Sequence, residues 1–187
     1  MGIRYYTGIG SRKTPEPILS YMRYIAGTLN GYGYTLRSGH AVGADRAFES
    51  KANLADIYLP WEGFGVKPYK DDLGQIVSGN TIVMDDFKLP LHFDIYKQVC
   101  KNMGRSWGDM PSGVRKLTYR DVHQVIGHDR IPIKSDFVIC WTNESGGTHY
   151  AMETANIFNV PVLNIFELGE EQTFIKLYKI LNAKGKL

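Results

Sequence analysis

The fold is decided by a stretch in which a short apolar run, a small polar loop and a helical pattern follow one another: Tyr34-Thr35-Leu36-Arg37-Ser38-Gly39-His40-Ala41-Val42-Gly43-Ala44-Asp45-Arg46-Ala47-Phe48. The first four residues have the composition of a buried strand. The residues after Gly43 place small and aromatic side chains at helical spacing, which predicts a helix to about Asn53. The stretch therefore predicts one strand–loop–helix unit.

Two further segments have the same arrangement. A predicted strand at 3–7 leads into Thr7-Gly8-Ile9-Gly10-Ser11-Arg12 and a helix that we expect to start at Pro15, with Thr14 as its N-cap. An apolar run at 136–141 leads into Glu144-Ser145-Gly146-Gly147-Thr148 and another helix. Strands that alternate with helices form parallel sheets, so we expect an α/β fold: an open parallel sheet with helices on both faces.

The pattern is weaker between about residues 63 and 134. Residues 61–86 contain several glycines and no clear helical face, whereas 89–103 and 117–126 are predicted to be helical, with a loop at 105–113. We interpret 63–134 as an insertion or cap at the carboxyl edge of the sheet. The length of 187 residues favours a single domain, which ends with a strand at 160–165 and a helix at 170–181.

Composition excludes several classes of protein. The 43% hydrophobic content and net charge of +3 are typical of a globular chain rather than a disordered one. The two cysteines lack metal-ligand spacing, and Cys140 lies in an apolar run that predicts a buried thiol. No metal and no cofactor are predicted. We find no signal peptide and no apolar run of about 20 residues, so we expect a cytoplasmic protein without a membrane segment.

The three strand-end loops suggest a ligand site. Such loops meet at the carboxyl edge of a parallel sheet, where helix N-termini bind phosphate and glycine lets it approach the backbone. The sequence therefore predicts a bound phosphorylated nucleoside; the alternative is that the glycines only make tight turns. The dinucleotide-binding fingerprint Gly-x-Gly-x-x-Gly would need a glycine three residues after Gly10. This chain has Lys13 there, so the fingerprint is not present. The predicted ligand-binding residues are Gly8, Gly10, Ser11, Arg12, Ser38, Gly39, His40, Gly43, Asp45, Arg120, Ser145, Gly146, Gly147 and Thr148.

These motifs resemble the SLOG superfamily over roughly residues 3–61 and 135–166. The similarity lies in Gly10-Ser11-Arg12, in residues 37–49 and 58–61, and in residues 137–142, 146–148 and 160–164. It implies a Rossmann-like fold, in a superfamily that includes DNA-processing recombination mediators, Lonely-guy phosphoribohydrolases and nucleotide-sensing domains of bacterial immunity. Residues 116–127 are similar to phage-encoded and bacterial members. The resemblance also implies a homo-oligomer.

Three functions remain open. Lonely-guy enzymes carry a catalytic Glu where this chain has Tyr150, so our first hypothesis is a module that binds a nucleotide or nucleotide-derived signal without cleaving it. The second is N-glycosidic cleavage of a nucleoside monophosphate, with Asp45, Glu49 or Glu153 as the catalytic carboxylate. The third is a recombination accessory that binds single-stranded DNA, which a net charge of only +3 does not favour.

Overall fold

The computed structural model describes residues 2–65, 78–84, 92–143 and 146–183. Strands and helices alternate over most of this length. In chain order they are β1 (Arg4–Gly10), α1 (Glu16–Gly31), β2 (Tyr34–Ser38), α2 (Ala44–Glu49), β3 (Leu54–Leu59), β4 (Ser78–Val83), α3 (Phe93–Asn102), η1 (Trp107–Asp109), α4 (Ser112–Ile126), β5 (Val138–Trp141), α5 (Gly147–Ile157), β6 (Val162–Asn164) and α6 (Ile165–Ala183).

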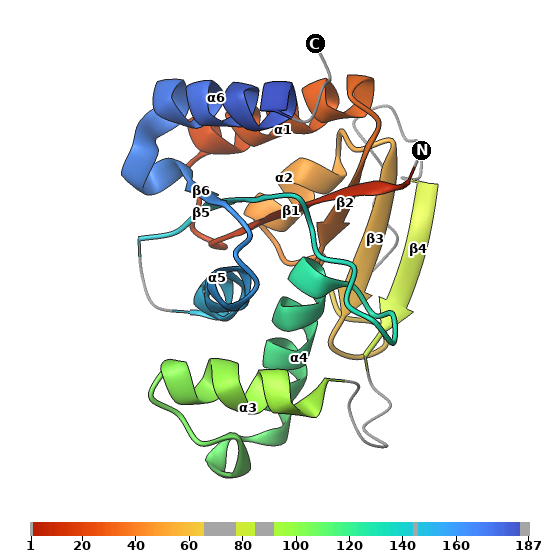
Figure 1. Ribbon diagram of the computed structural model, residues 1–187, viewed down its shortest axis with the longest axis vertical. Helices are drawn as coiled ribbons and strands as arrows, with labels where there is room; N and C mark the ends of the chain where they lie inside the picture. The colour runs from red at the N-terminus through yellow and green to blue at the C-terminus, as the bar shows by residue number, and fades with distance from the viewer. Residues whose placement is uncertain (1, 66–77, 85–91, 144–145, 184–187) are drawn as a thin grey trace.

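The described strands form one six-stranded sheet in the order β4-β3-β2-β1-β5-β6, and every pair is parallel (Figure 1). The chain proceeds from β1 outward to β4 and then returns to the other side of β1 to form β5. The strand order therefore reverses between β1 and β5. In open α/β sheets the crevice beyond the carboxyl ends of such a strand pair is the usual place for a ligand.

Helices cover both faces of the sheet, which confirms the predicted layers (Figure 1). Side chains alternate along β1, so Tyr6 points to one face and Ile9 to the other. Tyr6 lies in a core shared with α1, α2 and α6, whereas Ile9 lies in a core shared with α3, α4 and α5. The protein is thus a Rossmann-like α/β/α sandwich with two apolar cores.

The sequence predicts that the segment from 63 to 134 is an insertion, but two of its described elements are part of the central sheet and of the helices that cover it. Strand β4 is an edge strand paired with β3, and α4 lies against the sheet with Val122, Val125 and Ile126 fully buried. Among the described residues of this segment, α3 forms an added layer on the outside of α4 and α5, and η1 packs against α3 (Figure 1). The described part of the expected cap therefore belongs largely to the sandwich. Much of the glycine-rich stretch, Gly74 included, lies outside the described residues.

Several predicted boundaries also change. Helix α1 starts at Glu16 after Pro15, and Thr14 does not cap it; the Thr14 hydroxyl instead donates to the carbonyl of Ser11 at 2.7 Å. Helix α2 ends at Glu49 rather than near residue 53. Helix α4 begins five residues earlier than predicted, at Ser112, and α6 begins at Ile165 with a non-helical Gly169 inside it.

Two kinds of feature are absent from the described residues. None of the helices in that part of the chain is long and apolar enough to cross a membrane. Within the same residues no group of three or more His, Cys, Asp or Glu side chains is placed to hold a metal ion. Cys140 is a buried free thiol, as the apolar run around it predicts.

Candidate functional site

A pocket of about 270 Å³ lies at the point where the strand order reverses. Its walls come from the loops after β1, β2 and β5, from the start of α5 and from one side of α4. The residues that line it are Ile9, Gly10, Ser11, Arg12, Lys13, Ala41, Asp45, Leu117, Arg120, Asp121, Gln124, Thr142, Gly146, Gly147 and Thr148. All three predicted strand-end loops thus contribute residues to a single pocket.

The loop after β1 is fixed to the neighbouring strand. The Ser11 backbone N–H donates to the carbonyl of Trp141, the last residue of β5, at 2.9 Å. The Ser11 carbonyl accepts from Thr14, and the Ser11 hydroxyl accepts from the Lys13 backbone N–H at 3.1 Å. This turn leaves the side chains of Arg12 and Lys13 exposed at the pocket rim, so the rim carries two positive charges.

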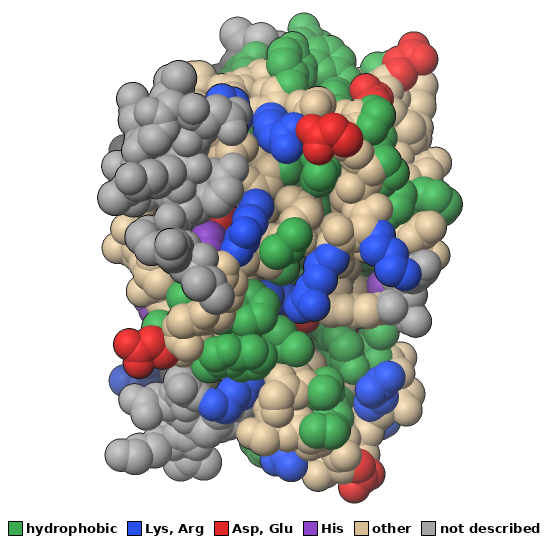
Figure 2. Space-filling view, turned by 180° about the vertical axis from the view of Figure 1, so that it is seen from behind, with side chains coloured by type: hydrophobic (Ala, Val, Ile, Leu, Met, Phe, Trp, Pro, Cys, Tyr) green, Lys and Arg blue, Asp and Glu red, His purple; other side chains and the backbone are tan. Residues whose placement is uncertain are grey.

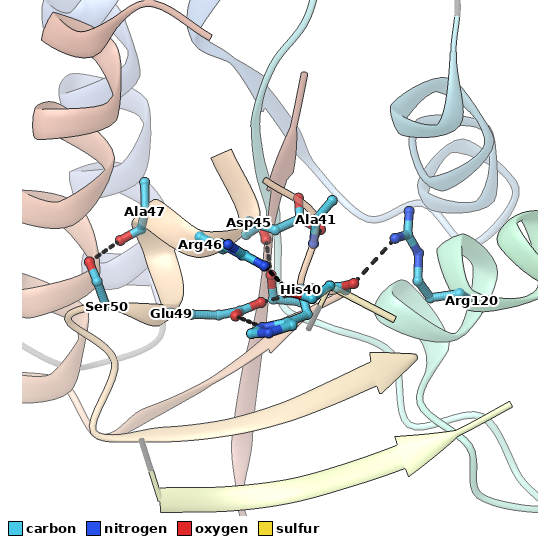
Figure 3. Close-up of polar contacts among 12 residues, drawn as sticks. His40, Ala41, Asp45, Arg46, Ala47, Glu49, Ser50 and Arg120 are labelled. Atoms are coloured by element: carbon cyan, nitrogen blue, oxygen red, sulfur yellow. Dashed lines mark hydrogen bonds and ion pairs between the residues drawn. The ribbon is translucent and has the colours of Figure 1, made fainter. Parts of the chain in front are cut away.

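Arg120 brings a third positive charge into the pocket from α4. Its side chain is buried and reaches the loop after β2, where Nη1 donates to the Gly39 carbonyl at 3.2 Å (Figure 3). Nε and Nη2 both donate to Asp121 Oδ1, at 2.9 and 2.6 Å. Burial opposes the charge, but the carboxylates of Asp121 and Asp45 outweigh it and raise the pKa of Arg120 above its ordinary value. The guanidinium therefore stays charged inside the pocket.

Two carboxyl groups lie beside this guanidinium. Asp45 is 3% exposed, and its Oδ2 accepts from the Ala41 backbone N–H at 3.3 Å. Burial raises the pKa of Asp45 to about 7; Arg120 opposes that shift and Glu49 adds to it. Burial also raises the pKa of Asp121, against the effect of Arg120. Asp45 is therefore able to exchange a proton near neutral pH.

His40 and Glu49 hold the shape of the loop after β2. His40 has a positive φ of 59°, and its backbone N–H donates to Glu49 Oε1 at 2.9 Å. The His40 ring atom Nδ1 lies 2.6 Å from Glu49 Oε2, and both side chains are buried (Figure 3). Neither residue lines the pocket. Their contacts support the loop from beneath, so Glu49 is not placed to act on a ligand.

Most of the loop glycines make room for protein atoms. A Cβ on Gly8 would lie 2.6 Å from Phe48 Cγ, and one on Gly10 would lie 2.7 Å from Ala44 Cβ. Gly43 has a φ of +96°, and a Cβ there would lie 2.8 Å from the Ser11 carbonyl oxygen. At all three positions these contacts support the alternative that the glycines only make tight turns. At Gly146, by contrast, an added Cβ would meet none of the described atoms that surround it within 4 Å.

Gly39 makes room for side chains from α4. A Cβ on Gly39 would lie 2.3 Å from Gln124 Nε2 and 2.9 Å from Arg120 Cδ. Because glycine has no Cβ, these two side chains can pass directly against the loop. Gly39 thus shapes the pocket through the helix it contacts rather than by contacting a ligand itself.

The predicted site residues divide into two groups. Those that the structure brings to the pocket are Gly10, Ser11, Arg12, Asp45, Arg120, Gly146, Gly147 and Thr148. Those described residues that do not line it are Gly8, Ser38, Gly39, His40, Gly43, Glu49 and Glu153. Ser145 lies outside the described residues.

Two members of the second group have other partners. The Ser38 hydroxyl is buried and donates to the Gly8 carbonyl at 3.0 Å. Glu153 accepts at 2.5 Å from the side-chain amide of Asn102, on the outer face between α3 and α5. Both side chains therefore act within the scaffold, and Glu153 is not placed for catalysis in the pocket.

Some lining residues were not among the predicted ligands, namely Lys13, Asp121 and Thr142. Gln124 and Asp121 lie three residues apart on α4, and Leu117 and Arg120 share their side of the helix. A polar stripe on a helix suggests a solvated surface, which hides such a site in the sequence. The sequence contains one indication of a buried polar site: Arg120 is followed directly by an acidic residue, in a segment whose apolar neighbours are buried.

Comparison with protein-family models and with curated proteins finds no match for this chain. Membership of the SLOG superfamily is therefore a prediction from the motifs, and the pocket itself provides the physical basis for a function.

Proposed function

We propose that the pocket binds a phosphorylated nucleoside or a nucleotide-derived ligand, and that the chain is a member of the SLOG superfamily. One observation carries the binding proposal. Arg12, Lys13 and Arg120 and the N-terminus of α5 converge on a single pocket where the strand order reverses. Cations and free helix N–H groups together favour an anionic ligand.

The phosphate binds at the rim of the pocket. Helix α5 has 11 residues, begins at Gly147 and follows Gly146, where an added Cβ would meet no described atom within 4 Å. A phosphate there would accept from N–H groups of the first turn and from the side chains of Arg12 and Lys13. Deeper in the pocket Asp45 and Asp121 would repel a second negative charge.

The size of the pocket limits the ligand. Its volume of about 270 Å³ is slightly below the roughly 300 Å³ at which pockets for drug-sized ligands begin. It suits the sugar and phosphate of one nucleotide, with the base at the mouth. Single-stranded DNA needs a groove for about 4–16 nucleotides per binding domain. Figure 2 shows the Lys and Arg side chains of one face scattered rather than gathered in a strip, so we do not favour DNA.

Calorimetric titration and thermal shift test this proposal. The ligands are nucleoside mono-, di- and triphosphates, cyclic nucleotides, ADP-ribose and inorganic phosphate. We expect binding that weakens as salt is raised, and an Arg12→Gln variant about tenfold weaker than wild type because one charge-assisted contact is lost. Lys176→Gln, an exposed cation on α6, is the matched control and keeps wild-type affinity. The absence of binding by every one of these ligands would refute the proposal.

A second function is supported by Asp45. A carboxyl group that lines the pocket and has a pKa of about 7 suits a general acid for cleavage of an N-glycosidic bond. The assay is release of free base from nucleoside monophosphates. Asp45→Asn should abolish the release, whereas Glu153→Gln should not change it, since Glu153 lies outside the pocket. Equal rates for Asp45→Asn and wild type would eliminate this candidate.

Two coarser proposals follow as well, one from the lack of targeting and membrane segments in the sequence and one from the family resemblance. We propose that the protein is cytoplasmic and that it forms a homo-oligomer. Light scattering coupled to size-exclusion chromatography measures the mass directly. A mass equal to the 21.1 kDa of one chain at all concentrations would refute the oligomer.

A further inference from the structure

Two buried polar atoms at the floor of the pocket have no hydrogen-bond partner among the described residues. They are Oδ2 of Asp121 and Nε2 of Gln124. The two residues are 2% and 1% exposed. Nearly all buried polar groups in native proteins are hydrogen-bonded, so a pair of exceptions that face one pocket points to a partner supplied by a ligand.

The two atoms differ in chemistry. Asp121 has used Oδ1 on Arg120, and its Oδ2 is a charged acceptor that requires a donor. Gln124 Nε2 is a donor that requires an acceptor. The two residues are three positions apart on α4, so they lie on one side of the helix. A hydroxyl group is both donor and acceptor, and a pair of neighbouring hydroxyls can satisfy both atoms at once.

The backbones of two glycines lie close to these atoms. A Cβ on Gly147 would lie 3.0 Å from Asp121 Oδ2, and a Cβ on Gly39 would lie 2.3 Å from Gln124 Nε2. Because glycine has no Cβ, the start of α5 can lie close to Asp121 Oδ2, and the loop after β2 can lie close to the Gln124 amide.

Other parts of a nucleotide fit this floor less well. A phosphate would meet the carboxyl groups of Asp45 and Asp121. A base usually stacks on an aromatic ring, and none of the described residues that line the pocket is aromatic. A sugar is uncharged, compact and rich in hydroxyls, so it matches both the volume and the polar groups.

We propose that Asp121 and Gln124 form a subsite for the ribose hydroxyls of the ligand, and that this subsite selects ribonucleotides over deoxyribonucleotides. One hydroxyl donates to Asp121 Oδ2, and a neighbouring hydroxyl oxygen accepts from Gln124 Nε2. This subsite rests on the proposed function, because it requires that a phosphorylated nucleoside enters the pocket. It predicts weak discrimination among bases, since the base stays at the mouth.

The test compares the affinities of adenosine 5′-monophosphate and its 2′-deoxy and 3′-deoxy forms by calorimetry. A hydrogen bond to a charged group contributes enough that we expect at least one deoxy form to bind about 10- to 100-fold more weakly. Ribose 5-phosphate should also bind better than 2-deoxyribose 5-phosphate. In Gln124→Met and Asp121→Asn variants the preference for the hydroxylated ligands should fall toward one, and Lys176→Gln should keep it.

The outcomes are distinct. If neither these ligands nor any of those used to test the proposed function binds, the proposed function and the subsite both fail. If all forms of adenosine monophosphate bind with equal affinity, the function survives and the subsite is wrong. A strong preference among adenosine, guanosine and cytidine monophosphates that Gln124→Met removes would assign the floor to the base and overturn the ribose proposal.

Stability of the variants provides a second measurement. Gln124→Met removes an unpaired buried donor and keeps side-chain length, so the ligand-free variant should melt at or above the wild-type temperature. A lower melting temperature would show that the amide already has a partner in the protein, against the proposal. Should Asp121→Asn fail to fold because Arg120 loses its counter-charge, the Gln124→Met variant decides the question alone.

Discussion

Replacing Asp45 with Asn tests whether this carboxyl group is buried at a real cost in free energy. Burial raises the pKa of Asp45 from its ordinary value of 3.8 to about 7 in the folded protein. Below the lower pKa, folded and unfolded chains are both protonated at this position. Between the two pKa values the unfolded chain has lost the proton and the folded chain has kept it. The free energy of unfolding of the wild type therefore falls as pH rises through this window, and it levels off above the higher pKa.

The magnitude follows from the shift. Each pKa unit corresponds to about 1.4 kcal/mol, so the full window between 3.8 and about 7 is worth about 4 kcal/mol. From about pH 5 to about pH 8 the expected loss is about 3 kcal/mol. Asn is uncharged at every pH, so the Asp45→Asn variant lacks this loss. Relative to the wild type, the variant should gain stability by that amount over the same range.

Urea unfolding of the ligand-free proteins at several pH values measures the difference. Subtracting wild type from variant removes the titration of groups that both proteins share. Asp109→Asn, an exposed carboxylate on η1, controls for the loss of one negative charge at the surface. If the difference for Asp45→Asn is flat from about pH 5 to about pH 8, Asp45 is ionised in the folded protein throughout, and it is not a proton donor near neutral pH.

Three further expectations concern the scaffold. Gly10→Ala should lower the free energy of unfolding by about 1–3 kcal/mol, because the new Cβ would collide with backbone atoms. Gly27→Ala, on the exposed side of α1, should raise the free energy of unfolding by about 0.5–1 kcal/mol. Urea unfolding measures both variants, and equal effects would contradict the close packing at Gly10. Glu49→Ala should cost about 2–3 kcal/mol in thermal unfolding, because His40 loses its buried partners, and a variant as stable as wild type would refute that role. Burial lowers the pKa of His123 from 6.5 to about 4, so the wild type should lose stability as pH falls across that interval, and His123→Gln should lose less in acid unfolding.

The sheet was predictable because its central strands are apolar and each is followed by a glycine loop and a helix. Strand β4 was not, because Ser78-Gly79-Asn80-Thr81 carries little apolar character and an edge strand needs little. Its identity as a strand comes from pairing with β3, which is a long-range contact. No local pattern contains that information.

Most of the buried polar residues of α4 were hidden for a related reason, although Arg120 was predicted to bind the ligand. Arg120, Asp121, His123 and Gln124 look like a solvated helix surface, yet all four are buried. Burial is tolerated because the partners come from elsewhere: His123 Nδ1 donates to the Gly127 carbonyl, and Nε2 accepts from the Tyr96 hydroxyl. Hydropathy describes a side chain by itself and not the groups to which it hydrogen-bonds. A sequence pattern therefore cannot distinguish a buried polar network from a solvent-exposed surface.

The close contacts at the loop glycines have a consequence for how a ligand is captured. Gly10 against Ala44, Gly43 against Ser11 and Gly39 against Gln124 fix the loops after β1 and β2 to each other, to α2 and to α4. Tightly packed loops cannot rearrange around an incoming ligand. Little conformational entropy is therefore lost when the ligand binds. The pocket then discriminates between ligands by excluding those whose shape does not match it. We expect association without a slow closing step, and dissociation rates that account for most differences in affinity between ligands.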